Sequence, residues 1–108
     1  MKPYQSEITG HLDLFVGNDE EEGGTESWQT ILIHGDSEGL RSFARFLLRL
    51  ADLQQDELPD LPVGAREHVS LRPDLDLSTN SAEVVVGRLD AKGTGAFYDR
   101  YVARSSYK

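Results

Sequence analysis

The sequence contains no cysteine, which excludes disulfide bonds and thiolate metal ligands. It also has no apolar run near the about 20 residues that a membrane-spanning helix requires. The residues after Met1 lack the apolar segment of a signal peptide. We therefore expect a cytoplasmic protein that does not enter a membrane.

Familiar catalytic and metal-binding motifs are missing as well. The chain has no HExxH, no GxSxG serine elbow and no P-loop lysine. His11, His34 and His68 each lie in or beside a predicted strand, either as separate half-exposed side chains or as a metal site gathered by neighbouring strands. Their local spacing specifies no site, so we predict a protein that is not an enzyme, with no catalytic residues, no metal and no cofactor.

Positive charge is scarce, with 11 Lys and Arg against 19 Asp and Glu and a net charge of −8. Such a surface repels nucleic acid and anionic membranes, and it accelerates encounter with a basic protein. Four of the acids are consecutive: Asp19, Glu20, Glu21 and Glu22. They form either a solvated loop or a contact patch for a basic partner.

One helix is well marked, and it is predicted from about residue 37 to residue 54. Asp36 is the expected N-cap, because its carboxylate can accept hydrogen bonds from free N–H groups in the first turn. Gly39 would allow close approach of a neighbouring strand. Arg41, Arg45 and Arg49 define a face that we expect to be solvated. The opposite face is predicted to be buried and comprises Leu40, Phe43, Ala44, Leu47, Leu50 and Ala51, with Phe46 and Leu53 widening it on one side.

Alternating and apolar segments predict four strands at residues 8–16, 28–34, 68–72 and 82–89. The chain 1–108 is therefore expected to be a small single α+β domain in the order ββαββ. One antiparallel sheet would carry the long helix on one face. Residues 17–27 are predicted to form a flexible acidic loop. The tail, 91–108, is expected to be either a short helix or an irregular, mobile segment.

Three segments carry a resemblance to a known family: Gly35–Ala51 with its G-D-x-E-G-L-R helix start, His68–Leu75 with H-V-x-L, and Leu77–Val86 with S-A-E. Over about residues 28–90 the chain resembles immunity protein family 32 of bacterial polymorphic toxin systems. The resemblance implies an α+β protein that binds and neutralises a cognate toxin. It transfers no catalytic residue to this sequence.

These observations favour a non-enzymatic protein-binding module with a basic protein as its partner. The family resemblance implies that this partner is a toxin. The expected contacts are Asp19, Glu20, Glu21 and Glu22, with Trp28 as an apolar anchor. Phe15 and Trp28 on the solvated sheet face would favour an interface. The alternative is a self-associating structural or regulatory module, a homodimer formed through an exposed sheet face or edge strand.

Overall fold

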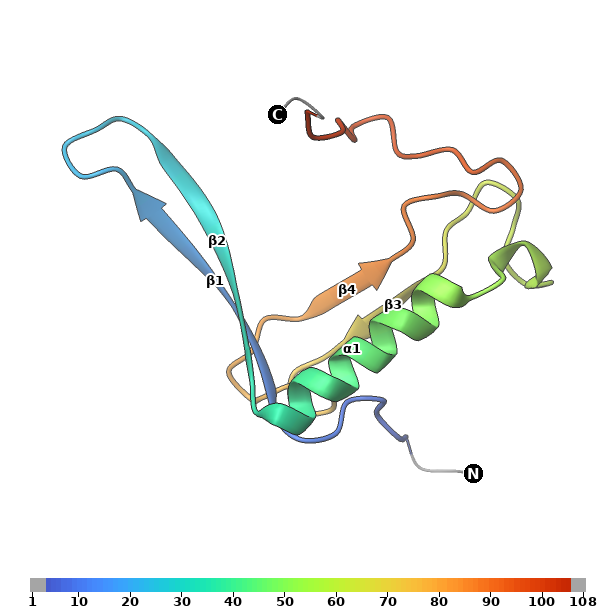
Figure 1. The fold of residues 1–108 in the computed structure, drawn as a ribbon, viewed down its shortest axis with the longest axis horizontal. Coiled ribbons are helices and arrows are strands. Elements are labelled where there is room, and N and C mark those ends of the chain that lie inside the picture. The colour runs from blue at the N-terminus through green and yellow to red at the C-terminus, as the bar shows by residue number, and fades with distance from the viewer. Residues whose placement is uncertain (1–3, 106–108) are drawn as a thin grey trace.

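The computed structural model describes residues 4–105, and it has the α+β composition and the ββαββ order predicted from the sequence (Figure 1). The elements are β1 (Leu12–Glu20), β2 (Ser27–Gly35), α1 (Ser37–Asp52), a short 3-10 turn η1 (Gln55–Glu57), β3 (His68–Leu71) and β4 (Val84–Gly87).

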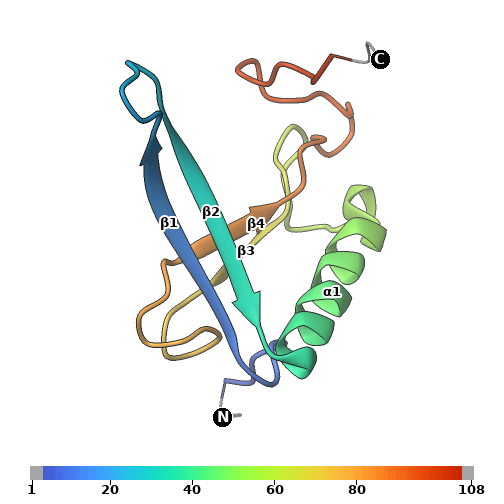
Figure 2. The ribbon, with the colours of Figure 1, turned by 60° about the vertical axis from the view of Figure 1, so that its left-hand side comes forward.

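The strands form two antiparallel pairs, β1 with β2 and β3 with β4, where we predicted one sheet. Figure 2 shows the long β1–β2 hairpin crossing β3 and β4, with α1 to one side. The chain entering β4 joins the two pairs at the base of the hairpin. Ser78 N–H donates to the Leu12 carbonyl at 3.0 Å, and Ala82 N–H donates to the Leu14 carbonyl at 2.8 Å.

The hairpin is longer than predicted, and the expected loop at 17–27 is wrong in its bounds. β1 continues to Glu20 and β2 begins at Ser27, so only residues 21–26 connect the strands. Two hydrogen bonds of 3.0 Å close this turn, from Glu21 N–H to the Glu26 carbonyl and from Gly24 N–H to the Glu21 carbonyl. The extra strand residues are mostly polar and do not alternate with apolar ones, so the sequence pattern did not predict a strand there. Hydrogen bonding between β1 and β2 keeps these residues extended.

The start of α1 is as predicted. The Asp36 carboxylate accepts a hydrogen bond from Gly39 N–H at 2.8 Å and one from His11 N–H at 3.0 Å. One carboxylate therefore satisfies a free donor of the helix and fixes the segment that leads into β1. The helix ends at Asp52, two residues before the predicted end.

The predicted buried face of α1 is partly wrong. Leu50 is buried, but Leu40 and Leu47 are 46% and 39% exposed. Ala44 and Ala51 are also exposed, and Phe43 is half-buried. The residues that face the core are Gly39, Ser42, Phe46 and Leu50.

The small residues Gly39 and Ser42 explain this rotation, because they let the chain before β1 lie against the helix. A Cβ atom at Gly39 would stand 1.8 Å from the His11 carbonyl oxygen, so only glycine fits. The Ser42 hydroxyl donates to the Thr9 carbonyl at 2.8 Å and accepts from Thr9 N–H at 3.0 Å. The close approach expected at Gly39 is confirmed.

The hydrophobic core lies where the base of the hairpin meets α1 and the β3–β4 pair. Its buried members are Ile8, Leu12, Leu14, Phe46, Leu71 and Leu77, and Phe43, Val69, Val84 and Val86 pack against them. The core reaches Leu14 on β1, and Val16 is already 43% exposed. The distal part of the hairpin therefore projects beyond the core. Among residues 4–105, no helix has the length and apolarity needed to cross a bilayer.

Residues 91–105 contain neither helix nor strand, so the described part of the predicted tail is irregular, and residues 106–108 of that prediction lie outside the described residues. The Phe97 and Tyr101 rings meet edge to face, with their centres 5.5 Å apart. Arg66 holds this segment by donating to the Ala96 carbonyl at 2.7 Å and lying 3.9 Å from the centre of the Tyr98 ring.

Candidate partner-binding surface

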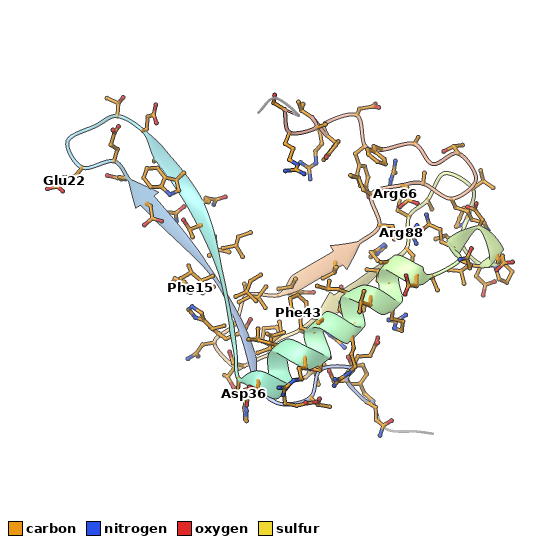
Figure 3. All side chains as sticks on the ribbon, viewed as in Figure 1. Phe15, Glu22, Asp36, Phe43, Arg66 and Arg88 are labelled. Carbon is orange, nitrogen blue, oxygen red and sulfur yellow. The ribbon has the colours of Figure 1, made fainter. Side chains whose placement is uncertain are left out.

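The predicted contact residues gather at the far end of the hairpin, which we call the acidic tip (residues 19–28). Asp19 and Glu20 end β1, Glu21 and Glu22 lie in the turn, and Trp28 is the second residue of β2. Asp19 stands directly opposite Trp28 in the ladder, so their side chains share one face of the hairpin. All five residues are exposed, and Figure 3 shows Glu22 at the extreme of the molecule. The structure therefore brings the predicted set together.

The hairpin carries charge of one sign. Between residues 12 and 35 there is no Lys or Arg, and the six carboxylates are Asp13, Asp19, Glu20, Glu21, Glu22 and Glu26. The Asp19 carboxylate accepts a hydrogen bond from the Thr30 hydroxyl at 2.7 Å. Within the part of the chain that the structure describes, Glu20, Glu21 and Glu22 have no side-chain hydrogen bond or ion pair. Their charge is therefore available to a partner.

An apolar strip runs along the same face as Trp28. Phe15 stands opposite Leu32 in the ladder, and Gly17 lies between them and the tip. A Cβ atom at Gly17 would be 3.6 Å from Leu32 Cδ1 and 3.8 Å from Phe15 Cε2, so these side chains flank a shallow position without a side chain. Phe15 and Trp28 are 57% and 51% exposed. Phe15 thus adds an aromatic anchor to the predicted contact set, signalled by its place opposite the core-facing residues of its strand.

A second apolar stripe was not predicted as exposed. On the other hairpin face, Val16, Ile31 and Ile33 are 43%, 65% and 46% exposed. The stripe continues onto α1, because Leu40 lies beside Gly35 on this face, where a Cβ atom would be 3.2 Å from Leu40 Cγ. Hydrophobicity alone could not show this exposure, because the same residues would suit the core of a closed sheet.

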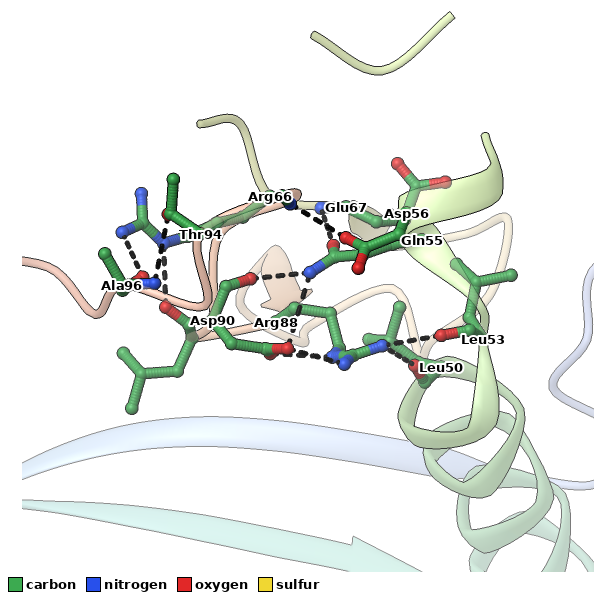
Figure 4. A network of polar contacts seen from close by, with 12 residues as sticks. Leu50, Leu53, Gln55, Asp56, Arg66, Glu67, Arg88, Asp90, Thr94 and Ala96 are labelled. Carbon is green, nitrogen blue, oxygen red and sulfur yellow. Dashed lines mark hydrogen bonds and ion pairs between the residues drawn. The ribbon is translucent and has the colours of Figure 1, made fainter. Parts of the chain in front are cut away.

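A second group of charged side chains lies at the C-terminal end of α1 (Figure 4). Arg88 donates to the two oxygens of Asp90 at 2.9 and 2.7 Å and to the carbonyls of Leu50 and Leu53 at 3.3 and 2.9 Å. Gln55 is buried, donates to the Asp90 carbonyl at 2.6 Å and accepts from Glu67 N–H at 3.1 Å. The Arg88 hydrogen bonds hold the pKa of Asp90 below its usual value.

This group lines an open depression of about 750 Å³, but its polar atoms already have partners within the protein. Arg88 supplies the donors that the last carbonyls of a helix lack, and it places cationic charge at the negative end of the helix dipole. We assign the group to holding β4 against α1.

The histidines are separate. His11 Nδ1 lies 2.8 Å from the Asp36 carboxylate, and the His68 ring lies 3.2 Å from the Arg66 carbonyl. Together with the backbone donors of Gly39 and His11, the His11 ring lowers the pKa of Asp36 to about 2. Among residues 4–105, no three His, Asp or Glu side chains are arranged to hold a metal ion.

Residues 30–89 match the family model of immunity protein 32, a segment that runs from Thr30, the fourth residue of β2, through α1, β3 and β4 to Leu89. No curated protein and no solved structure matches the chain. Residues 19–22 and Trp28 lie outside the matched segment. The match spans more than half of the sequence and confirms the resemblance predicted from residues 28–90, so the chain belongs to the immunity protein 32 family.

Proposed function

We propose that this protein is a cytoplasmic, non-enzymatic immunity protein that binds a cognate toxin through the acidic tip and thereby neutralises it. The carrying observation is the hairpin itself, whose projecting part carries five carboxylates, at residues 19–22 and 26, and no Lys or Arg. The family match supports a toxin as the partner. The charge supports a basic surface on that toxin.

The two kinds of residue at the tip would contribute in different ways. Glu20, Glu21 and Glu22 would steer a basic partner and raise the association rate, an effect that salt weakens. Trp28 and Phe15 would be buried on binding and slow dissociation, because aromatic anchors dominate the energetics of protein interfaces. Inhibition would follow from covering the toxin surface, which requires no chemical step.

The test begins with affinity purification of the tagged protein from its native cells at low and high salt, followed by mass spectrometry. We expect one basic protein, encoded beside this gene, retained at low salt and weakened at high salt. Its toxicity is then measured by growth of cells that express it with or without this protein. If the captured protein stops growth and the wild-type chain does not restore it, the proposed function is contradicted.

A matched pair of variants tests the tip. Replacing Asp19, Glu20, Glu21 and Glu22 with serine should weaken affinity for the captured partner by roughly 100-fold at low salt. The control variant replaces four other exposed acids with serine and should retain wild-type affinity. They lie at or after the C-terminal end of α1 and are Asp52, Asp56, Glu57 and Asp60. Equal loss in both variants, or affinity that does not change with salt, would contradict binding through the tip.

Self-association is a second candidate function, and one observation favours it. The chain exposes 8523 Å². A compact folded protein of 12.0 kDa exposes about 6,000 Å², so this chain exposes about 2,500 Å² more. Its radius of gyration is 17.0 Å, against about 13 Å for a compact domain of this length. The irregular tail accounts for part of this surface. The projecting hairpin and the exposed apolar stripe of Val16, Ile31, Ile33 and Leu40 account for another part.

A further inference from the structure

Strand β2 is an exposed edge without the features that usually protect edges. Its nine residues, Ser27–Gly35, contain no Asp, Glu, Lys, Arg or Pro, in a chain of which 28% is charged. Within residues 4–105, its backbone hydrogen bonds run to β1 and to no other strand. Edge strands normally carry charge, proline or a bulge that prevents pairing with another chain. β2 is therefore suited to accept a further strand.

The side chains of β2 are also exposed on the face that continues the core. Ile31 is 65% exposed and Ile33 is 46% exposed. Leu40, which lies beside Gly35 and is 46% exposed, extends the same apolar surface onto α1. The strand therefore offers a second copy unpaired backbone groups along its edge and exposed apolar side chains on this face.

We propose that β2 pairs antiparallel with β2 of a second copy of this chain, joining the two hairpins into one four-stranded sheet. This inference rests on the self-association candidate and is independent of toxin binding. An antiparallel edge is self-complementary under a two-fold axis perpendicular to the sheet. Directly opposite residues share a face, so one residue must pair with its own copy across the axis. Ile31 is the middle residue of the strand and is assigned that place.

The charges of the chain favour this arrangement over other contacts between two acidic copies. With Ile31 at the axis, Ser27 of one copy stands beside Gly35 of the other. The two acidic tips then lie at opposite ends of the shared edge, roughly 27 Å apart for a strand of this length. That distance exceeds the screening length of about 8 Å at physiological salt. The uncharged segment alone would form the contact.

The two-fold also accounts for the apolar stripes. An axis perpendicular to the sheet leaves both copies of Val16, Ile31 and Ile33 on the same side of the joined sheet. Because Leu40 lies beside Gly35 on that face, both α1 helices lie on this side as well. The paired sheet would therefore carry the exposed apolar side chains of both hairpins and Leu40 of both helices on one shared face. There, the side chains of one copy can cover those of the other.

Single cysteines test the register, because the natural chain has none and any disulfide must join two copies. Under mild oxidation, Ile31→Cys should form a covalent dimer, since opposite Cα atoms in an antiparallel pair lie about 4.5–5.5 Å apart. Ile33→Cys, on the same strand and face, should react at least roughly tenfold more slowly, because its two copies would be roughly 14 Å apart. Val85→Cys on β4, 61% exposed, is the control for random collision and should also be slow. Faster reaction at Ile33 or at Val85 would overturn the assigned axis.

The mass of the full chain in solution tests the pairing itself. Sedimentation equilibrium should show a concentration-dependent dimer that Ile31→Lys weakens by roughly 100-fold, because two like charges would face each other across the axis. Val85→Lys is the matched control and should dimerise as the wild type does. A monomer at all concentrations would overturn self-association altogether. A dimer insensitive to Ile31→Lys would overturn pairing through β2 while leaving self-association intact, and neither result affects the toxin test. Circular dichroism of each variant verifies that it remains folded.

Discussion

The acidic tip and the C-terminal end of α1 both gather charged side chains, but they use them in opposite ways. At the end of α1, Arg88 binds one carboxylate and two helix carbonyls, so its charge is consumed inside the protein. At the tip, Glu20, Glu21 and Glu22 have no such partners within the described chain. Charge that is already paired stabilises the fold, whereas unpaired charge on a projecting hairpin is free to act on another molecule.

The contrast also separates the two kinds of substitution that the protein should tolerate. Changes in the body, where segments are packed and hydrogen-bonded, should cost free energy of unfolding and leave the chemistry of the tip alone. Changes at the tip should affect binding and leave stability almost unchanged. Four predictions test this separation.

The largest effect is expected at Gly39, where the hairpin base meets α1. Gly39→Ala would place a methyl group 1.8 Å from the His11 carbonyl oxygen, a backbone atom that cannot move aside easily. We expect a loss of about 3 kcal/mol in the free energy of unfolding, measured by urea denaturation. Gly17→Ala is the control, since its new Cβ would have its nearest neighbour at 3.6 Å and should change stability little. Equal tolerance of both would contradict the close approach.

Arg88 should have the next largest effect. Arg88→Ala removes the donors to Leu50, Leu53 and Asp90 and should cost about 2 kcal/mol, because partly buried acceptors lose their partners. Thermal unfolding provides the measurement. The control is Arg45→Ala, whose ion pair with Glu38 is solvent-exposed and should contribute nothing measurable. A wild-type melting temperature in Arg88→Ala would show that the group does not hold β4 to the helix.

Asp36 should give a smaller, pH-dependent effect. Its pKa of about 2 lies below the about 3.9 of an unfolded aspartate. Stability linked to this group is therefore complete above pH 4 and is lost as the pH falls toward 2. Asp36→Asn keeps an N-cap side chain but cannot titrate, so its melting temperature should fall less steeply across this range. Asp60→Asn is the control, and its melting temperature should fall with pH as steeply as that of the wild type. If Asp36→Asn shows the same pH dependence as the wild type, Asp36 is not the source of this linked stability.

The smallest effect on stability is expected at the tip. The variant with serine at Asp19, Glu20, Glu21 and Glu22 should unfold within about 0.5 kcal/mol of the wild type, since these side chains lie outside the core. Urea denaturation of this variant beside its affinity measurement would separate the two properties directly. A large loss of stability would mean that the tip supports the fold, and the binding result could then no longer be read as a contact effect.

Local signals in the sequence were sufficient for the elements and insufficient for their packing. Asp36 marked the helix start, and alternation marked the strands. The continuation of β1 to Glu20 depends on pairing with Ser27–Thr30, which no local pattern encodes. The buried face of α1 was predicted wrongly because hydrophobicity favours Leu40 and Leu47. In the structure Gly39 and Ser42 are buried instead, because their small side chains let the chain before β1 lie against the helix.

The candidate site shows the same limit. Consecutive acids were visible in the sequence, but their position at the end of a projecting hairpin, opposite Trp28, required the ladder. The bare stripe of Val16, Ile31 and Ile33 could not be distinguished from a core stripe, because burial depends on what packs against it. Division of the strands into two pairs decided that outcome.

The separation of the acidic tip from the core has a consequence for how such a protein can diversify. The family match begins at Thr30, so β1 and the turn of the hairpin lie outside it. Residues 19–22 are exposed and are not members of the hydrophobic core. Under the proposed function, new side chains there would alter which partner is recognised without requiring the rest of the chain to repack. Under the proposed function, the hairpin would thus be a site where specificity could change by single substitutions while one scaffold is retained.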